Sequence, residues 1–393
     1  MKITNINMIG GRGPVSPAAM VQVHTDEGEV GIGSTSAPIP VIAALVEDLK
    51  PLLVGEDATR PNHLWRKMFE GWQSQRGRGG EGGVAVNAMA AIDMAIWDAA
   101  GKALGKPIHQ LLGGAIKPRI MVYASATAYD YLGSRQAGQT QWKSADQLAD
   151  ESRAYVSEGF KAIKFGWGNR YEPADIEKLA AIREAIGPDT LLMLDFGCPA
   201  YNCDGWNVRD AAPVVRRLDP FDLFFFEEAL HPYDVEGFAE LTRLSPIKIA
   251  TGESLVTLRD FDHFIHRRAV DVIQPDAQQI GITTFRRVAD HAEAAGMLCI
   301  PHCPWTAMAV AAHLQVLCTF TNGVLIEYPA TAGFRGVPFM EELNDVMSYR
   351  IVDTPVTYRD GYIEVDDRPG LGIGQYVPEA VAKLDAMTPV KYP

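Results

Sequence analysis

Eight short apolar runs recur between residues 118 and 330 of this chain, and a stretch with the spacing of an amphipathic helix separates each run from the next. The runs read RIMVYASA, FKAIKFG, TLLMLDF, DLFFFE, IKIATG, VDVIQPD, MLCIPH and GVLIE. Strands that alternate with helices on this scale indicate a parallel sheet, and eight such units indicate a closed barrel. An open, doubly wound sheet is the structural alternative.

A second constraint is that seven of these runs end on a residue that can carry charge. The seven residues are Lys164, Asp195, Glu227, Glu253, Asp276, His302 and Glu327. Burying a charged group at the end of a core strand costs folding free energy unless the group has an ion-pair or hydrogen-bond partner, so such a group is retained for its pairing or for a function. Because a parallel barrel has its active site at the C-terminal ends of its strands, the series predicts a shared active site.

The segments before and after the predicted barrel show other residue patterns, and a chain of 393 residues is too long for a single ordinary hydrophobic core. Residues 1–35 alternate like antiparallel strands, and residues 40–112 carry helical spacing that Gly113 and Gly114 end. The predicted fold class is therefore α/β: a modified TIM barrel, (β/α)7β, in residues 118–345, with an α+β capping domain in residues 1–117. We expect the segment 346–393 to pack back on the capping domain.

Composition excludes several classes of partner. The formal net charge of −13 and the lack of a Lys/Arg cluster argue against nucleic-acid binding. No apolar run has the length of a membrane span and no secretory signal opens the chain, so we expect a cytoplasmic protein without a membrane partner. Cys299 and Cys303 flank His302, but the chain has no C-x2-C pair, which disfavours zinc.

Three of the strand-end residues predict a metal site. Asp195, Glu227 and Glu253 end consecutive strands, so their carboxylates would converge and repel one another unless a cation lies among them. Oxygen ligands with room for waters and substrate favour Mg²⁺ over zinc. The alternative is that these are ordinary strand-end acids paired with arginines.

The remaining strand-end residues suggest acid–base chemistry. Asp276 beside His302 would fix the tautomer of the imidazole and raise its basicity. Lys164 could serve as a base, as a Schiff-base amine or as a fixed positive charge. Glu327 could donate a hydrogen bond to a substrate carboxylate if burial retains its proton.

With these strand-end residues, the sequence resembles the enolase superfamily, and within it the mandelate racemase subgroup, over essentially the whole chain. The matching segments are GFKAIKFG, LLMLDFG, FFFEEALHPYD, IATGES, IQPDAQQIGITT, CIPHC, LIEYP and PGLGIG. The resemblance implies that Asp195, Glu227 and Glu253 bind Mg²⁺, that Asp276 and His302 form a dyad, and that Glu327 lies at the substrate carboxylate. It also implies a homo-oligomer, namely a dimer, tetramer or octamer.

Chemistry in this family begins with removal of the proton α to a carboxylate, giving an enediolate whose charge Mg²⁺ stabilises. Departures from the family pattern narrow the outcome. The family's lysine strand often reads Lys-x-Lys, with the second lysine as a base on the opposite face; here the strand has Gly166 at that position. Some acid-sugar dehydratases have a histidine two residues after the first ligand, where this chain has Gly197. Another branch has a lysine near Asp276 and no His dyad, and is excluded.

One strong acid–base group, His302, therefore remains. A single imidazole can remove the α-proton and, once protonated, protonate a departing β-hydroxyl on the same face. We therefore predict a Mg²⁺-dependent acid-sugar dehydratase (a hydro-lyase) that converts a small-molecule polyol carboxylate to a 2-keto-3-deoxy acid. The segment PHCP around His302 resembles that of aldonate dehydratases of the galactonate type.

Substrate contacts are predicted in the capping loops and after the barrel strands. The candidates are Arg76, Arg78, Tyr201, His231 and Trp305. The simpler alternative for each is a solvated loop or plain packing. The G-x-G-x-x-G of RGRGGEGG follows a helix instead of a strand, so the dinucleotide interpretation fails.

Two other functions stay open from the sequence. One is a racemase or epimerase whose second base is an unrecognised group, such as Tyr201 or a residue of a capping loop. The other is a non-catalytic member of the superfamily, although the intact ligands and dyad argue against it.

Overall fold

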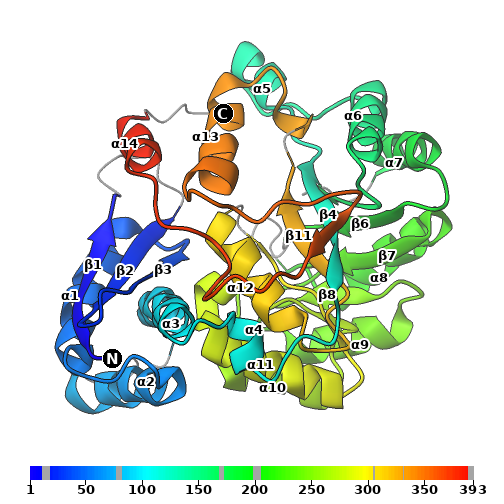
Figure 1. Cartoon of the computed structure of the whole chain (residues 1–393). Coiled ribbons are helices and arrows are strands. Elements are labelled where there is room, and N and C mark those ends of the chain that lie inside the picture. Colours follow the sequence, from blue (N-terminus) through cyan, green and yellow to red (C-terminus); the bar gives the residue numbers. More distant parts are fainter. Residues whose placement is uncertain are drawn as a thin grey trace.

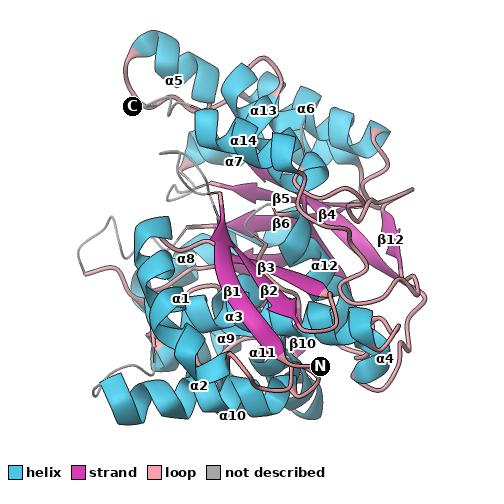
Figure 2. Ribbon diagram, turned by 60° about the vertical axis from the view of Figure 1, so that its left-hand side comes forward, coloured by secondary structure: helices cyan, strands magenta, loops and turns pink. Residues whose placement is uncertain are grey.

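The computed structural model describes residues 1–10, 18–76, 82–167, 172–197, 205–303, 306–330 and 332–387, without the side chains of residues 72–76 and 135. A small N-terminal domain lies beside a barrel of parallel strands with helices outside it (Figure 1). The view in Figure 2 shows the short antiparallel sheet of the first domain in front of the barrel. The predicted fold class, a barrel with an N-terminal α+β domain, is confirmed.

The N-terminal domain pairs three antiparallel strands with helices. The strands are β1 (Ile3–Ile9), β2 (Ala19–Thr25) and β3 (Val30–Thr35), and the helices are α1 (Ile39–Leu53), α2 (Pro61–Arg76), α3 (Val84–Ala103) and α4 (Ile108–Leu111). Two glycines of β3 let α3 pack directly on the sheet: a Cβ at Gly31 would lie 1.9 Å from the Ala95 carbonyl oxygen, and one at Gly33 would lie 2.2 Å from that of Ala91. The sheet therefore fixes α3 between itself and the barrel.

Helix α3 is the only described helix long and apolar enough to cross a membrane by length and composition. However, 89% of its most apolar 18 residues are buried inside the protein. It is a core helix, and its residues form the contact between the two domains.

The helical stretch predicted to run on to Gly113 is shorter in the structure. Helix α3 ends at Ala103, Gly105 takes a positive φ of 61°, and α4 restarts at Ile108. Pro107 precedes α4 and has no N–H to donate, so a continuous helix through this point would lack a backbone hydrogen bond. The sequence GKPIH therefore breaks a helix that its apolar spacing alone would extend.

The barrel consists of eight parallel strands in the order β10-β9-β8-β7-β6-β5-β4-β11. The strands are β4 (Arg119–Thr127), β5 (Ala162–Gly166), β6 (Leu191–Asp195), β7 (Leu223–Glu227), β8 (Ile249–Thr251), β9 (Val272–Ile273), β10 (Leu298–Cys299) and β11 (Leu325–Pro329). The outer helices are α5 (Tyr131–Ala137), α6 (Ala145–Ser157), α7 (Pro173–Ile186), α8 (Val208–Leu218), α9 (Val235–Leu244), α10 (Leu258–Arg267), α11 (Ala277–Ala294) and α12 (Ala307–Leu317).

The C-terminal segment first joins the barrel and then returns to the N-terminal domain. It contains α13 (Pro338–Asp345), β12 (Tyr362–Glu364), which pairs antiparallel with β4, and α14 (Pro378–Ala386). Between β12 and α14, the Leu371 N–H donates to Asp98 of α3 at 2.9 Å, and the Tyr376 hydroxyl donates to the Gly33 carbonyl at 2.7 Å. In Figure 1 the red α14 accordingly lies next to the blue sheet.

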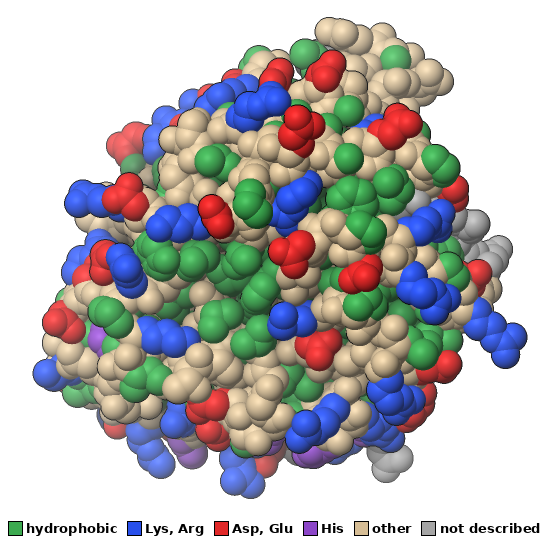
Figure 3. Space-filling model, turned by 90° about the vertical axis from the view of Figure 1, so that its right-hand side faces the viewer, with side chains coloured by type: hydrophobic (Ala, Val, Ile, Leu, Met, Phe, Trp, Pro, Cys, Tyr) green, Lys and Arg blue, Asp and Glu red, His purple; other side chains and the backbone are tan. Residues whose placement is uncertain are grey.

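One face of the barrel side of the molecule is shown in Figure 3, where acidic and basic side chains are interspersed. A band of hydrophobic side chains crosses the middle of this face. On this face, therefore, neither sign of charge forms a large continuous patch.

Candidate active site

The barrel interior is built in two layers, because side chains along a strand point inward at every second residue. The lower layer is an apolar cluster of Tyr123, Ala162, Met193, Phe225, Ala250, Val272, Ile300 and Leu325. Two residues farther along each strand stand Ser125, Lys164, Asp195, Glu227, Gly252, Gln274, His302 and Glu327. Almost every inward position of this second layer is polar. We call these eight residues the polar layer.

Strand β8 departs from this pattern. At its polar-layer position is Gly252, where a Cβ would lie 2.9 Å from the Gln274 backbone nitrogen. Only glycine fits such a close approach of two backbones. The charged residue of this strand is therefore the next one, Glu253.

Lys164 lies at the centre of the charged groups. Its ammonium donates to Glu227 Oε2 at 2.8 Å and lies 3.3 Å from Glu327 Oε1 and 3.6 Å from Asp195 Oδ2. Burial by itself would lower the pKa of Lys164, but the Glu227 and Glu327 carboxylates outweigh burial and hold the pKa well above its ordinary value. Lys164 is thus a fixed positive charge, which is one of the three roles its position allowed.

The three carboxylates predicted to bind metal occupy neighbouring positions. Asp195 pairs in register with Glu227, which pairs with Ala250, three residues before Glu253. Burial raises the pKa of Glu227, and Lys164 counters this effect only in part because Asp195, Glu327 and Glu253 add negative charge. Oxygen Oε1 of Glu227 is buried and has no hydrogen-bond partner among the described residues. This oxygen is placed to accept a cation.

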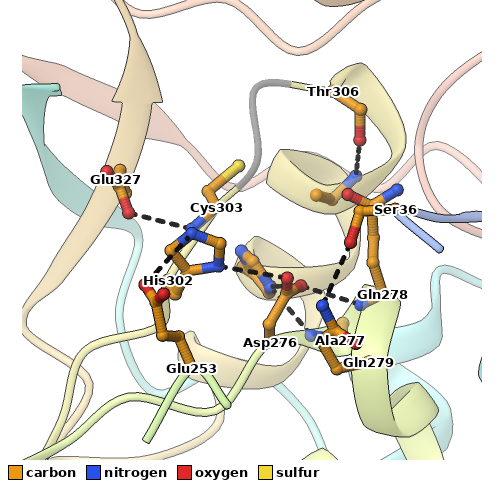
Figure 4. A network of polar contacts seen from close by, with 12 residues as sticks. Ser36, Glu253, Asp276, Ala277, Gln278, Gln279, His302, Cys303, Thr306 and Glu327 are labelled. Atoms are coloured by element: carbon orange, nitrogen blue, oxygen red, sulfur yellow. Dashed lines mark hydrogen bonds and ion pairs between the residues drawn. The ribbon is translucent and has the colours of Figure 1, made fainter. Parts of the chain in front are cut away.

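Asp276 and His302, the residues predicted to form the acid–base dyad, follow β9 and β10 (Figure 4). Nδ1 of His302 is 3.2 Å from Asp276 Oδ2, and Nε2 is 3.4 Å from Glu253 Oε2. Burial by itself would lower the pKa of His302, but Glu253 and Asp276 raise it well above its ordinary value. Burial would raise the pKa of Asp276, yet the hydrogen bond with His302 and the proximity of His313 lower it to about 2. Asp276 therefore stays ionised and orients the imidazole.

Glu327 is surrounded by groups that stabilise its carboxylate form. Its two oxygens accept from the Ser125 hydroxyl at 2.6 Å and from the Cys303 N–H at 2.9 Å. Burial by itself would raise the pKa of Glu327, but Lys164, His302 and these donors lower it below its ordinary value. Lys164 and the two donors thus favour the carboxylate form of Glu327, whereas the predicted hydrogen bond to a substrate carboxylate requires that Glu327 retain its proton. Glu327 connects β11 to β4, β5 and the segment after β10.

Sequence reasoning missed four polar residues around this centre. Glu228 takes a positive φ of 55° and accepts from the Thr251 hydroxyl at 2.8 Å; burial and Glu253 raise its pKa to about 8. His313 of α12 is fully buried, with Nε2 3.5 Å from Asp276 Oδ1. Gln274 is fully buried, and neither atom of its amide has a partner in the described part of the chain. Ser125, the fourth, holds Glu327. Counting two residues on from each apolar inward position would have found Ser125 and Gln274.

The predicted substrate contacts are placed only in part. Arg78, Tyr201 and Trp305 lie outside the described residues, and Arg76 ends α2 with a side chain that is likewise not described. His231 is exposed after β7, and its Nδ1 accepts from the Tyr233 N–H at 3.3 Å. Tyr233 lines a cavity of about 920 Å³ between α2, α10 and α11 whose lining includes none of the polar layer.

Within the described residues, no group of three or more His, Cys, Asp or Glu side chains is arranged to hold a metal ion as the side chains stand. The reason is visible in the contacts: Asp195 and Glu227 turn toward Lys164, and Glu253 turns toward His302. The donor set still suits a hard cation, because it offers three carboxylates, and one of them, Glu227, has a buried oxygen without a partner in the described part of the chain.

This fold and site define a barrel enzyme of the enolase type. The sequence profile described as "Enolase C-terminal domain-like" matches residues 147–375, which is more than half of the chain. The profile of the "Mandelate racemase / muconate lactonizing enzyme, N-terminal domain" matches residues 11–113. The chain belongs to the mandelate racemase/muconate lactonizing enzyme family of the enolase superfamily.

Similar proteins of known name include two dehydratases. An arabinonate dehydratase of Saccharolobus solfataricus is 30% identical over 89% of this chain and 86% of its own length. A D-galactonate dehydratase of Xanthomonas oryzae is 31% identical over 90% of this chain and 87% of its own.

Two solved structures are similar over nearly the whole chain. The 3,6-anhydro-D-galactonate cycloisomerase of Zobellia galactanivorans has a TM-score of 0.82 at 27% identity, covering 98% of this chain and 99% of that one. A mandelate racemase/muconate lactonizing protein of Paracoccus denitrificans, complexed with magnesium, has a TM-score of 0.78 at 27% identity, with 97% of both chains covered.

Proposed function

We propose that this protein is a Mg²⁺-dependent dehydratase of a sugar acid. The observation that carries the proposal is the asymmetry of the polar layer. His302, held by Asp276, stands on one side, whereas the lysine strand offers only the ion-paired Lys164 and then Gly166. A site in which the described residues offer one base in place to remove an α-proton suits an elimination, in which the same group takes one proton and returns it. The names of the two dehydratases support the same reaction class.

The residues act in the following order. Asp276 accepts the Nδ1 proton of His302, and Nε2 takes the α-proton of the substrate once Glu253, now 3.4 Å from Nε2, turns away and no longer favours the protonated imidazole. The electrons of the broken C–H bond form a carbon–carbon double bond as the β-hydroxyl leaves. The imidazolium gives its proton to that hydroxyl, which departs as water, and the enol product becomes a 2-keto-3-deoxy acid.

Asp195, Glu227 and Glu253 would hold Mg²⁺. When bound, the ion supplies positive charge at the substrate carboxylate, which makes the α-proton more acidic. Lys164 adds a second positive charge on the same side of the site, and Glu327 holds Lys164 in place through an ion pair of 3.3 Å. The anionic head of the substrate is thereby directed toward β5–β7, with its α-carbon facing His302.

A screen of aldonates and aldarates with Mg²⁺ tests the proposal. We expect at least one acid to yield a 2-keto-3-deoxy product, measured with a colour reaction specific for that group and by mass spectrometry as loss of one water. If every acid is recovered unchanged, or with inverted configuration only, the dehydratase proposal is wrong.

A cycloisomerase is the second candidate, because the structurally similar Zobellia protein has that name. Such a reaction also needs one group that removes and returns a proton, so the dyad alone does not separate it from dehydration. Anhydro-galactonates and sugar-acid lactones belong in the same screen. A product with the mass of its substrate would favour the cycloisomerase.

Gly166 gives a prediction that separates one-base from two-base chemistry. Among the described residues, a Cβ at Gly166 would meet only the Ala126 carbonyl oxygen, at 3.6 Å, so this part of the structure leaves room for a side chain there. We expect Gly166→Lys to introduce a second base and to catalyse exchange with inversion at the α-carbon, while dehydration falls. The measurement is deuterium incorporation from D2O into recovered substrate, with its configuration determined by chiral chromatography.

Gly166→Met is the matched control, because it adds similar bulk without a basic group. Equal inversion by wild type and both variants would mean that a second base already exists elsewhere. That result would favour a racemase or epimerase over the dehydratase.

A further inference from the structure

Helix α11 is broken one turn after it begins. Gly281 has φ 70° and ψ 166°, so residues 277–280 form a single turn that is separate from the rest of the helix. Asp276, the aspartate of the dyad, is the N-cap of this turn: its Oδ1 accepts from the Gln278 N–H at 2.8 Å. Its Oδ2 faces His302. The position of this one turn therefore determines where the dyad stands.

The break leaves backbone groups without their helical partners, and α3 of the N-terminal domain supplies replacements. In an unbroken helix the Gln279 carbonyl would accept from the Thr283 N–H. Here Asn87 Nδ2 donates to that carbonyl at 3.1 Å, and the Thr283 N–H donates to Asp93 Oδ2 at 2.9 Å. The Thr283 hydroxyl also donates to Asp93, at 2.7 Å.

The break also depends on a residue that is able to adopt it. A Cβ at Gly281 would lie 2.7 Å from Asp93 Oδ2 and 3.1 Å from the Trp65 ring, and the positive φ disfavours other residues. The close approach of α3 and the conformation of Gly281 thus require each other.

Side chains of the turn extend the contact to strand β3 and the residues after it. Gln278 Nε2 donates to the Ser34 hydroxyl at 2.6 Å, and both residues are fully buried. Gln279 Nε2 donates to the Ser36 hydroxyl at 3.0 Å (Figure 4). The N–H of Ala277, on the barrel side, donates to His313 at 3.1 Å. The turn is therefore held between the barrel and the N-terminal domain.

We propose that Asn87 and Ser34 of the N-terminal domain are positioning residues for the acid–base dyad, acting through the turn 277–280. This inference rests on the proposed function, since it assigns the dyad to proton transfer. Neither residue touches the dyad itself. The hydrogen bond from Asn87 satisfies the Gln279 carbonyl, which the break at Gly281 leaves without its helical partner, and Ser34 holds the Gln278 side chain of the same turn. Together they fix Asp276 relative to His302.

Asn87→Ala and Ser34→Ala test the proposal against Gln375→Ala. The control removes a hydrogen bond of the same kind onto the N-terminal domain, from Gln375 Nε2 to the Val30 carbonyl at 2.7 Å, but far along the chain from the turn. We expect kcat to fall roughly 10-fold or more in Asn87→Ala with KM changed less than about 2-fold, because a small misplacement of a catalytic group is costly. Gln375→Ala should retain kcat, and its melting temperature shows how much of any effect is general destabilisation.

Hydrogen–deuterium exchange supplies a readout that needs no substrate. Peptides covering residues 277–283 should exchange faster in Asn87→Ala than in wild type, and at the wild-type rate in Gln375→Ala. Unchanged exchange in Asn87→Ala overturns the proposal, as does faster exchange with kcat no lower than in the control. A wild-type enzyme that dehydrates no acid would overturn the proposed function alone, because the exchange comparison still decides whether Asn87 holds the turn.

Discussion

The variant His302→Asn should lose both dehydration and exchange of the α-proton with D2O. Asparagine can still hydrogen-bond to Asp276, now 3.2 Å from the imidazole, but it cannot accept a proton. Because general acid–base groups contribute about 10²- to 10⁴-fold each and His302 takes both roles in the proposed mechanism, we expect a loss at the upper end of that range or beyond. Product formation and deuterium uptake, measured on the same samples, check the result.

His291→Asn is the matched control for this experiment. His291 also pairs with an aspartate, Asp262, at 2.7 Å, but on the outer helices α10 and α11. It should retain wild-type activity. If His302→Asn dehydrates its substrate as fast as His291→Asn does, another group removes the proton and the proposed role of His302 fails.

Removal of Mg²⁺ should reduce activity to background, and added Mg²⁺ should restore it. Binding should also be visible without turnover, because a ligand at about 100 times its dissociation constant stabilises the folded state by about 2.7 kcal/mol. We expect Mg²⁺ to raise the melting temperature of the wild type by a few degrees. Glu227→Gln should abolish this rise, since it removes the charge of a carboxylate whose Oε1 no described residue contacts by a hydrogen bond.

The control for the metal experiment is Glu151→Gln, which breaks another nearly buried pair, between Glu151 and Lys143, outside the barrel. Its melting temperature should still rise with Mg²⁺. An equal rise in Glu227→Gln would show that the ion binds elsewhere.

The repeating part of this molecule was predictable from sequence because its signal is periodic. Each strand has a run of apolar residues with an inward side chain at every second position, which is why the sequence alone could assign Lys164, Asp195, Glu227 and Glu327 to one end of the barrel. The order of the strands follows from the right-handed connection of parallel strands.

The features that were missed depend on departures from this period. The positive φ of Glu228 and the break at Gly281 interrupt a strand end and a helix, and apolar spacing carries no trace of either. Lys164 pairs with Glu227 because this carboxylate lies nearer to the ammonium than those of Glu327 and Asp195. The spacing of residues in the sequence does not give these distances. The ionised state of Glu327 follows from its donors, Ser125 and the Cys303 backbone, which only the folded chain brings together.

The position of Lys164 also affects the stability of the protein before it has bound its metal ion. Small metal-dependent domains commonly unfold without their ion, because binding of the ion supplies much of their folding free energy. Here the three carboxylates would also repel one another without an ion, but the Lys164 ammonium neutralises part of their charge, at 2.8 Å from Glu227 and 3.6 Å from Asp195. The barrel should therefore fold and stay folded in a cell depleted of magnesium. It would be inactive there and should regain activity as soon as the ion returns.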